Sequence, residues 1–205
     1  MLLSCVIALS VAGSTPTVGD FSGLTPGCRR IYELREGKRV GQMVEEVGPS
    51  QKIGGKVVYP VTISSEGTVG SRTYFAIDGD TLNVMAISER VLLKSPMPVI
   101  KVGPGLVRWE FKENSPVSPQ ANPVTVSAES SLKGKRRILG AERDVLEVKF
   151  TAESRPGDVP FKLSQTVLYA AGIGMVEFEM ESTLSQTTVK SKRTLKQFVA
   201  PKQAG

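Results

Sequence analysis

The feature that most constrains this chain is an alternation of apolar and polar residues with a period of two. It is clearest within residues 165–180, where glycines at 172 and 174 separate two such runs. In the second run, apolar residues alternate with glutamates: Val176, Phe178 and Met180 with Glu177, Glu179 and Glu181. Because neighbouring side chains of a β-strand point to opposite faces, this spacing predicts a strand with one apolar and one acidic face. Tyr169 lies in the preceding predicted strand, and Gly172 and Gly174 form the predicted turn.

The same alternation recurs along most of the chain, and a helical period is almost absent. The pattern predicts about eleven strands, at residues 32–35, 41–47, 56–64, 72–77, 81–87, 106–112, 124–132, 143–152, 161–169, 174–184 and 187–198. Residues 88–105 contain three prolines and are predicted to be an irregular connection between two halves. Many short strands with regular turns favour an all-β fold, either a sandwich, a barrel or one large curved sheet.

One turn has a particularly strong signature, Asp78-Gly79-Asp80 between two alternating runs. Glycine and aspartate tolerate the positive φ angles of tight hairpin turns, so these residues predict a hairpin. The alternative is a calcium site at Asp78 and Asp80. Calcium takes six or more oxygen ligands, and two carboxylates alone are a weak signal, so no metal site and no cofactor are predicted.

The two halves of the chain resemble each other in pattern. Three pairs of segments correspond, namely 27–34 with 105–111, 55–63 with 142–150, and 73–80 with 167–174. We interpret this as two pseudo-repeats, about 24–87 and 100–184. They would lie in one β domain at residues 20–199, followed by a frayed tail at 200–205.

Residues 1–19 carry no charge, begin with an apolar run and end in small and turn-forming residues. This composition predicts a secretory signal peptide, although the usual positively charged start is missing, and the alternative is a buried first strand or helix. The protein is therefore expected to be exported to the periplasm, the cell surface or the medium. Residues 2–5 also resemble a bacterial lipobox, in which Cys5 would be lipidated, but simple export is preferred. After cleavage only Cys28 remains, which excludes an intramolecular disulfide.

The net charge is +6, and positive charges are dense only at residues 133–137 and 190–193. The first run is predicted to be a hairpin turn and the second an exposed strand face. Both are interpreted as solvated surface, so no nucleic-acid partner is expected, while peripheral contact with a membrane stays open.

The chain has no histidine, which excludes Ser-His-Asp and Cys-His catalysis and most zinc sites. It also lacks a nucleophile elbow, a phosphate loop and a dinucleotide fingerprint. Glu177, Glu179 and Glu181 share a predicted strand face, but this spacing is typical of an exposed polar face. A non-enzymatic protein is therefore predicted, and a carboxylate-based hydrolase stays open.

Several of these motifs together resemble the TapB-like group of exported bacterial proteins of unknown function. They are a leucine or isoleucine, a glycine and an aromatic strand at 24–32 and 100–109, the turn at 74–80, and above all Leu-Tyr-Ala-Ala-Gly-Ile-Gly-Met-Val at 168–176. Leu168 replaces the usual tryptophan of that motif, and Ala171 replaces the usual proline. The resemblance implies a curved antiparallel sheet similar to the half-barrel of periplasmic lipoprotein carriers, whose concave face can hold acyl chains. It attaches no functional role to any residue.

Two functions fit these observations. The first is a binding module that holds a lipid-like or other apolar ligand on the concave face of the sheet. Eight apolar residues would line that face: Val107, Trp109, Phe111, Leu146, Val148, Phe150, Val176 and Phe178. The second is a structural or interaction module of the cell envelope, which pairs its exposed strand edges with a protein partner.

Overall fold

The computed structural model describes residues 15–88, 91–113, 124–154 and 161–201. Within these residues the chain forms one large antiparallel sheet and one short helix, α1 (Val18–Ser22). The first half of the chain contributes β1 (Arg29–Glu36), β2 (Arg39–Val47), β3 (Gln51–Ile53), β4 (Lys56–Ser65), β5 (Thr68–Asp78), β6 (Thr81–Ser88) and β7 (Val91–Lys101). The second half contributes β8 (Val107–Glu113), β9 (Val124–Ile138), β10 (Ala141–Ser154), β11 (Phe161–Ala170), β12 (Gly174–Leu184) and β13 (Thr187–Val199).

The order of strands in the sheet is β7-β6-β5-β4-β2-β1-β13-β12-β11-β10-β9-β8, and β3 pairs with β4 beside this path. Each half of the chain therefore forms a run of neighbouring strands, and the two runs meet where β1 pairs with β13. The three pairs of similar sequence segments also correspond in the order of strands. Counted from β1 in the first run and from β8 in the second, β1 corresponds to β8, β4 to β10 and β5 to β11. Both edges of the sheet, β7 and β8, come from the middle of the chain.

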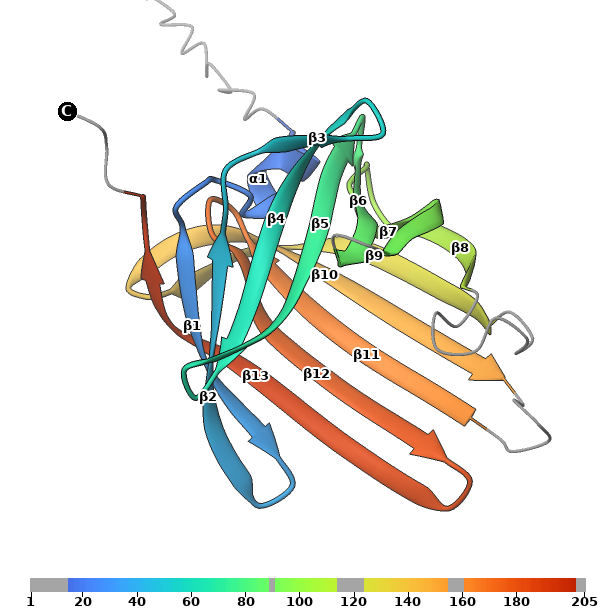
Figure 1. Cartoon of the computed structure of the whole chain (residues 1–205). Coiled ribbons are helices and arrows are strands. Elements are labelled where there is room, and N and C mark those ends of the chain that lie inside the picture. Colours follow the sequence, from blue (N-terminus) through green and yellow to red (C-terminus); the bar gives the residue numbers. More distant parts are fainter. Residues whose placement is uncertain (1–14, 89–90, 114–123, 155–160, 202–205) are drawn as a thin grey trace, which may run out of the picture.

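The predicted all-β fold with one large curved antiparallel sheet is confirmed, and the sheet curves until its two edges approach each other. Figure 1 shows β4 and β5 crossing over β10 to β13, so that the sheet is a nearly closed barrel rather than a half-barrel. Trp109 Nε1 on β8 donates a hydrogen bond to the Pro98 carbonyl on β7, at 3.3 Å. Side-chain contacts of this kind join the edges where the backbone ladder stops.

The main hydrophobic core lies between the two halves of the sheet. It joins Val47, Val61 and Ile100 of the first half to Val148 and Phe150 of the second. Helix α1 belongs to the same core through the buried side chains of Val18 and Phe21. The helix thus lies at one end of the barrel (Figure 1), where its apolar side closes the interior.

The described residues contain thirteen strands, where about eleven were predicted. The main difference is β7, which occupies most of the segment predicted to be irregular because of its prolines. As an edge strand, β7 pairs only with β6, so a proline that lacks an N–H costs no ladder bond on the open side. Pro98 lies opposite Asn83, and Pro96 falls where the register between β6 and β7 is interrupted.

The turn predicted at residues 133–137 was also wrong, because these residues lie within β9 and the β9–β10 turn is at 139–140. Gly134 does adopt a positive φ of 72°. Here it produces a bulge, in which the two residues Lys133 and Gly134 lie opposite the single residue Val145. By contrast, the hairpin predicted at Asp78-Gly79-Asp80 is present, with Gly79 at a φ of 60° between β5 and β6.

Candidate functional site

The interior is organised by a close contact between the end of α1 and the β11–β12 turn. The Gly172 amide donates a hydrogen bond to the Asp20 carbonyl at 2.8 Å. Gly23 and Gly174 both have positive φ angles, and a Cβ added to Gly23 would lie 2.4 Å from the Ile173 carbonyl oxygen. Glycine is therefore required at Gly23, because only a residue without a side chain lets the two backbones come this close.

A buried ion pair lies directly beneath this contact. Arg30 Nε on β1 donates to Glu45 Oε2 on β2 at 3.0 Å. Arg30 Nη1 donates to the carbonyls of Gly23 and Ile173, at 2.7 and 3.0 Å. The Tyr32 hydroxyl lies 3.0 Å from Glu45 Oε2 and 3.0 Å from the Met175 carbonyl. These bonds connect the two halves of the sheet to the end of α1.

Burial and neighbouring charges shift the pKa values of Arg30 and Tyr32. Burial alone would lower the pKa of Arg30, but the neighbouring Glu45 carboxylate and Tyr32 outweigh it and the pKa is raised. Burial, and then the negative charge of Glu45, raise the pKa of Tyr32 well above its ordinary value. Arg30 therefore keeps its positive charge and the Tyr32 phenol keeps its proton.

Next to the ion pair is an interior cavity of about 220 Å³. Its apolar lining comes from both halves and from the segment after α1: Leu24, Val61, Ile63, Phe75, Leu82, Val84, Val99, Tyr169, Met175 and Phe178. Its polar lining consists of Ser22, Arg30, Glu45, Thr73, Gln165 and Arg193. A concave, mainly apolar site with a few polar groups is the usual form of a small-molecule site.

The polar side of the cavity is formed by Arg193 on β13. Its guanidinium carbon lies 4.5 Å from the centre of the Phe178 ring, directly across the ladder on β12. Nε of Arg193 is buried and has no hydrogen-bond partner among the described residues. This half-buried cation therefore faces the cavity with part of its donor capacity unused.

Of the eight residues predicted to line a concave apolar face, seven belong to the main core or pack against it: Val107, Trp109, Phe111, Leu146, Val148, Phe150 and Phe178. The Trp109 and Phe150 rings meet edge to face, with centroids 6.2 Å apart. Most side chains of this predicted face are therefore part of the main hydrophobic core or pack against it. Only Phe178 reaches the cavity, and a ligand-binding role of the set stays a prediction.

Val176 does not share that face, although strict alternation places it with Phe178. Tyr169 pairs with Met175 and Leu168 pairs with Glu177, so Val176 is an extra residue in β12. This bulge turns its side chain into a second cluster that contains Leu168 and Leu195. Of the predicted turn residues, Tyr169 does more than support the turn, since it also lines the cavity.

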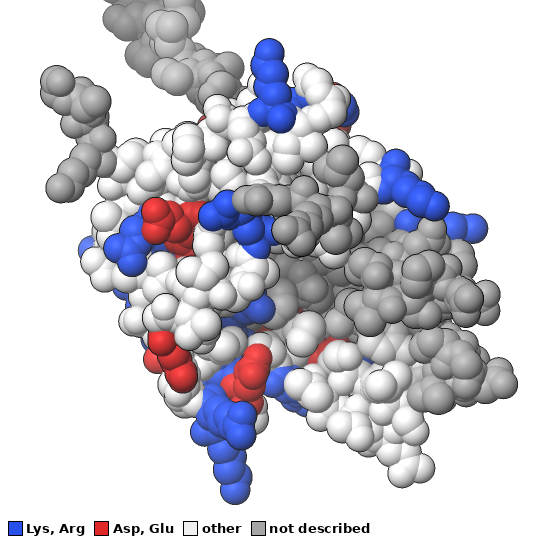
Figure 2. All heavy atoms as spheres, viewed as in Figure 1, with Lys and Arg blue, Asp and Glu red and all other residues white. Residues whose placement is uncertain are grey.

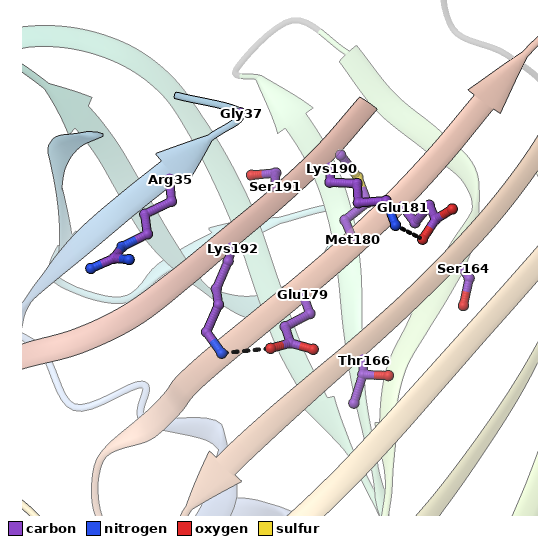
Figure 3. A pocket seen from close by; sticks show the side chains of 10 residues that line it. All are labelled: Arg35, Gly37, Ser164, Thr166, Glu179, Met180, Glu181, Lys190, Ser191 and Lys192. Carbon is purple, nitrogen blue, oxygen red and sulfur yellow. Dashed lines mark hydrogen bonds and ion pairs between the residues drawn. The ribbon is translucent and has the colours of Figure 1, made fainter. Parts of the chain in front are cut away.

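A larger depression, of about 560 Å³, lies over the charged face of β11 to β13 (Figure 3). Its charged groups already neutralise one another, because Lys192 contacts Glu179 at 2.6 Å and Lys190 contacts Glu181 at 2.9 Å. Figure 2 likewise shows charges of both signs interspersed over the described part of one face of the molecule. The charged depression therefore has the character of solvated surface.

Sequence reasoning missed the first-half wall of the cavity and Arg193. Residues 190–193 were interpreted as one exposed face, yet the alternation puts Lys190 and Lys192 on the outside with their glutamates and Arg193 on the inside. That alternation was the available signal.

Within the described ranges, no helix has the length and apolar character needed to cross a bilayer.

The fold and its interior cavity define an all-β protein with a nearly closed barrel, and two solved structures were found to be similar to it. One, described as a "putative lipoprotein" from Parabacteroides distasonis, has a TM-score of 0.53 and 12% identity, covering 88% of this chain and 99% of that chain. Another, described as a "putative exported protein with YmcC-like fold" from Bacteroides fragilis, has a TM-score of 0.47 and 11% identity, covering 89% and 100%. At this identity the first likeness shows the fold alone.

No family model and no curated protein matches the sequence. Membership of the TapB-like group therefore stays a prediction.

Proposed function

We propose that this protein is an exported, non-enzymatic binding protein that holds a small apolar molecule in its interior cavity. The observation that carries the proposal is the cavity between the two halves of the sheet, whose apolar lining comes from six strands and from Leu24. Export is supported by the composition of residues 1–19 and by the description of the similar structure from Parabacteroides distasonis as a lipoprotein.

The size of the cavity limits the ligand. At roughly 30 Å³ for each water-sized group, the 220 Å³ of this partly open cavity has room for about seven non-hydrogen atoms. A short acyl chain or a small ring system fits this volume, and a longer ligand would extend beyond it. The Arg30–Glu45 pair does not compete for the ligand, because its charges satisfy each other.

A binding role is supported over catalysis by the absence of histidine. In the part of the chain that the structure describes, no three His, Cys, Asp or Glu residues form a group suited to a metal ion. An interaction module that uses strand edges has less support, because Pro96 and Pro98 remove two donors from β7 and Trp109 bridges β7 and β8.

Mass spectrometry of an organic extract tests the proposal, using full-length protein purified from its native envelope. Near-stoichiometric recovery of one small apolar compound is the expected result. If the extract is empty and the folded protein also fails to bind a fluorescent fatty-acid probe, the proposal is wrong.

A cavity-filling variant then locates the site. Val99→Phe places a larger side chain against the cavity and should weaken probe binding at least about tenfold, since a ring occupies much of a cavity this small. Val40→Phe makes the same change on an exposed residue of β2 and should leave binding unchanged. Equal binding by both variants would place the ligand elsewhere.

A further inference from the structure

The cavity is lined by three ionised side chains, and their charges do not cancel. Arg30 and Glu45 neutralise each other at 3.0 Å. Arg193 forms no ion pair with any carboxylate of the described residues, so the cavity lining carries one uncompensated positive charge. This differs from the charged outer face, where the neighbouring Lys192 contacts Glu177 and Glu179 at 2.7 and 2.6 Å.

Hydrogen bonding gives a second sign of a missing partner. Nε of Arg193, which lines the cavity, is buried without a partner in the described structure, and so is Oγ of Ser191, which lies outside the cavity lining. The two residues are separated by one position in β13, so their side chains are on the same face. Met180 lies opposite Ser191, and Gln165 lies opposite Met180, which brings a side-chain amide to the same face. A buried donor without an acceptor is costly, and native proteins rarely leave one unless a ligand or water completes it.

Arg193 and the most buried aliphatic residues of the cavity differ in their exposure to solvent. Leu24, Leu82 and Val84 are almost fully buried, at 7%, 3% and 3% exposure, whereas Gln165 and Arg193 are half-buried. These three aliphatic side chains are thus buried more deeply than Arg193, as is the Arg30–Glu45 pair, while most of the other apolar residues of the lining are half-buried like Arg193. A more exposed cation beside buried aliphatic side chains suits an elongated molecule with an apolar end and a charged end.

We propose that the ligand of this cavity is an anionic amphiphile, whose carboxylate or phosphate group binds the Arg193 guanidinium while its apolar chain lies against Leu24, Leu82 and Val84. The proposal rests on the proposed function and adds the chemical class of the ligand. A planar guanidinium offers several donors in a fork that matches both anions. A cationic ligand would meet the uncompensated charge of Arg193 and be repelled.

Calorimetric titration of the full-length protein with three eight-carbon compounds tests this inference. Octanoate, octyl phosphate and octanol each contain eight carbon atoms, close to the seven or so non-hydrogen atoms for which the cavity has room, and they differ in the head group. A hydrogen bond to a charged group favours the anions by about ten- to a hundredfold over octanol. Acetate and inorganic phosphate serve as anions without a chain and should bind far more weakly than either octyl anion. The carboxylate and phosphate titrations show which head group is preferred.

Two variants of Arg193 and one control variant test whether Arg193 causes the preference for anions over octanol. Arg193→Met keeps a long apolar side chain and should reduce octanoate binding to the level of octanol, while octanol binding stays unchanged. Arg193→Lys should retain part of the preference for the anion. Arg108→Met removes an exposed arginine of β8 that pairs with Glu129 on the outer face, and should change nothing. The melting temperature of each variant shows that it is folded.

The outcomes separate the two proposals. Equal binding of octanoate, octyl phosphate and octanol by the unmodified protein overturns the inference and leaves the proposed function standing. Binding of none of the three overturns both. Acetate or inorganic phosphate binding as tightly as the octyl anions shows a plain anion site and overturns the inference. A preference for octanoate that persists in Arg193→Met also overturns it.

Discussion

The Glu45 carboxylate lies 3.0 Å from Nε of Arg30 in the interior of the barrel, with side-chain exposures of 10% and 4%. The same carboxylate is 3.0 Å from the Tyr32 hydroxyl. Arg30 also binds the carbonyls of Gly23 and Ile173. A single ion pair thus holds β1, β2, the β11–β12 turn and the end of α1 together, and it forms one wall of the cavity.

Removal of one partner of this pair should be much more harmful than removal of both. Glu45→Leu leaves the Arg30 charge buried without a counter-ion and should lower the free energy of unfolding by about 3–5 kcal/mol. Arg30→Met combined with Glu45→Leu removes both charges and should cost less than the sum of the two single variants. Urea denaturation measures all three. Additive losses would mean that the two charges do not interact.

Gly23 should tolerate alanine less well than Gly37, although both have a positive φ. Alanine in this conformation costs about 1–2 kcal/mol at either position. A Cβ on Gly23 also meets the Ile173 carbonyl, whereas Gly37 has nothing within 4 Å. Overpacking adds about 1–3 kcal/mol to the cost of Gly23→Ala. Thermal unfolding of the two variants checks the difference, and equal losses would contradict the close approach of α1 to the turn.

The exact start of the folded chain should matter for stability. The predicted signal peptide ends at residue 19, yet Val18 lies in α1 and is buried at 2% exposure. In addition, the Thr17 amide and hydroxyl donate to Asp20 Oδ2 at 2.7 and 2.8 Å. A chain that begins at Asp20 should therefore be less stable than one that begins at Thr15, by about 2 kcal/mol for the lost burial alone. Identical denaturation midpoints of the two chains would show that the first turn of α1 contributes nothing to the core.

Tyr32 should make stability depend on pH in the alkaline range. Burial and the Glu45 charge raise the pKa of Tyr32 well above its ordinary value of 10.0. The folded protein therefore holds this proton more tightly than the unfolded chain does, and the resulting stabilisation is complete below pH 10 and decreases above it. Between pH 9 and 11 the free energy of unfolding should fall less steeply in Tyr32→Phe than in the unmodified protein. Parallel slopes in the two proteins would contradict this.

Much of the fold could be predicted, because apolar and polar residues alternate along a strand that has one buried and one exposed face. The run around Phe178 and the Asp78-Gly79 turn each follow from a local rule, since face and turn geometry depend on residues close in sequence. The strand β7 could not be predicted in this way. Whether prolines are tolerated depends on which strand lies at the edge, and only the full topology decides that.

The candidate site was harder to predict than the fold. Val176 was misplaced because a bulge at one residue reverses the faces on which alternation relies. Arg193 was hidden in a run of charges whose other members are on the outer face. Leu82 and Val84 line the same cavity as Phe178, although they are almost a hundred positions away in the sequence. No local sequence pattern could predict that these residues lie close together.

The pairing of β1 with β13 has a consequence for how the chain reaches this structure. Arg29 lies opposite Val199, so the ladder that unites the two halves joins some of the residues farthest apart in the described sequence. During synthesis, the open edge of β1 has no native partner until the last strand exists. An unpaired edge is a template for association with other chains. Among the strands of this sheet, β13 is thus made after all the others, and it protects the edge of β1.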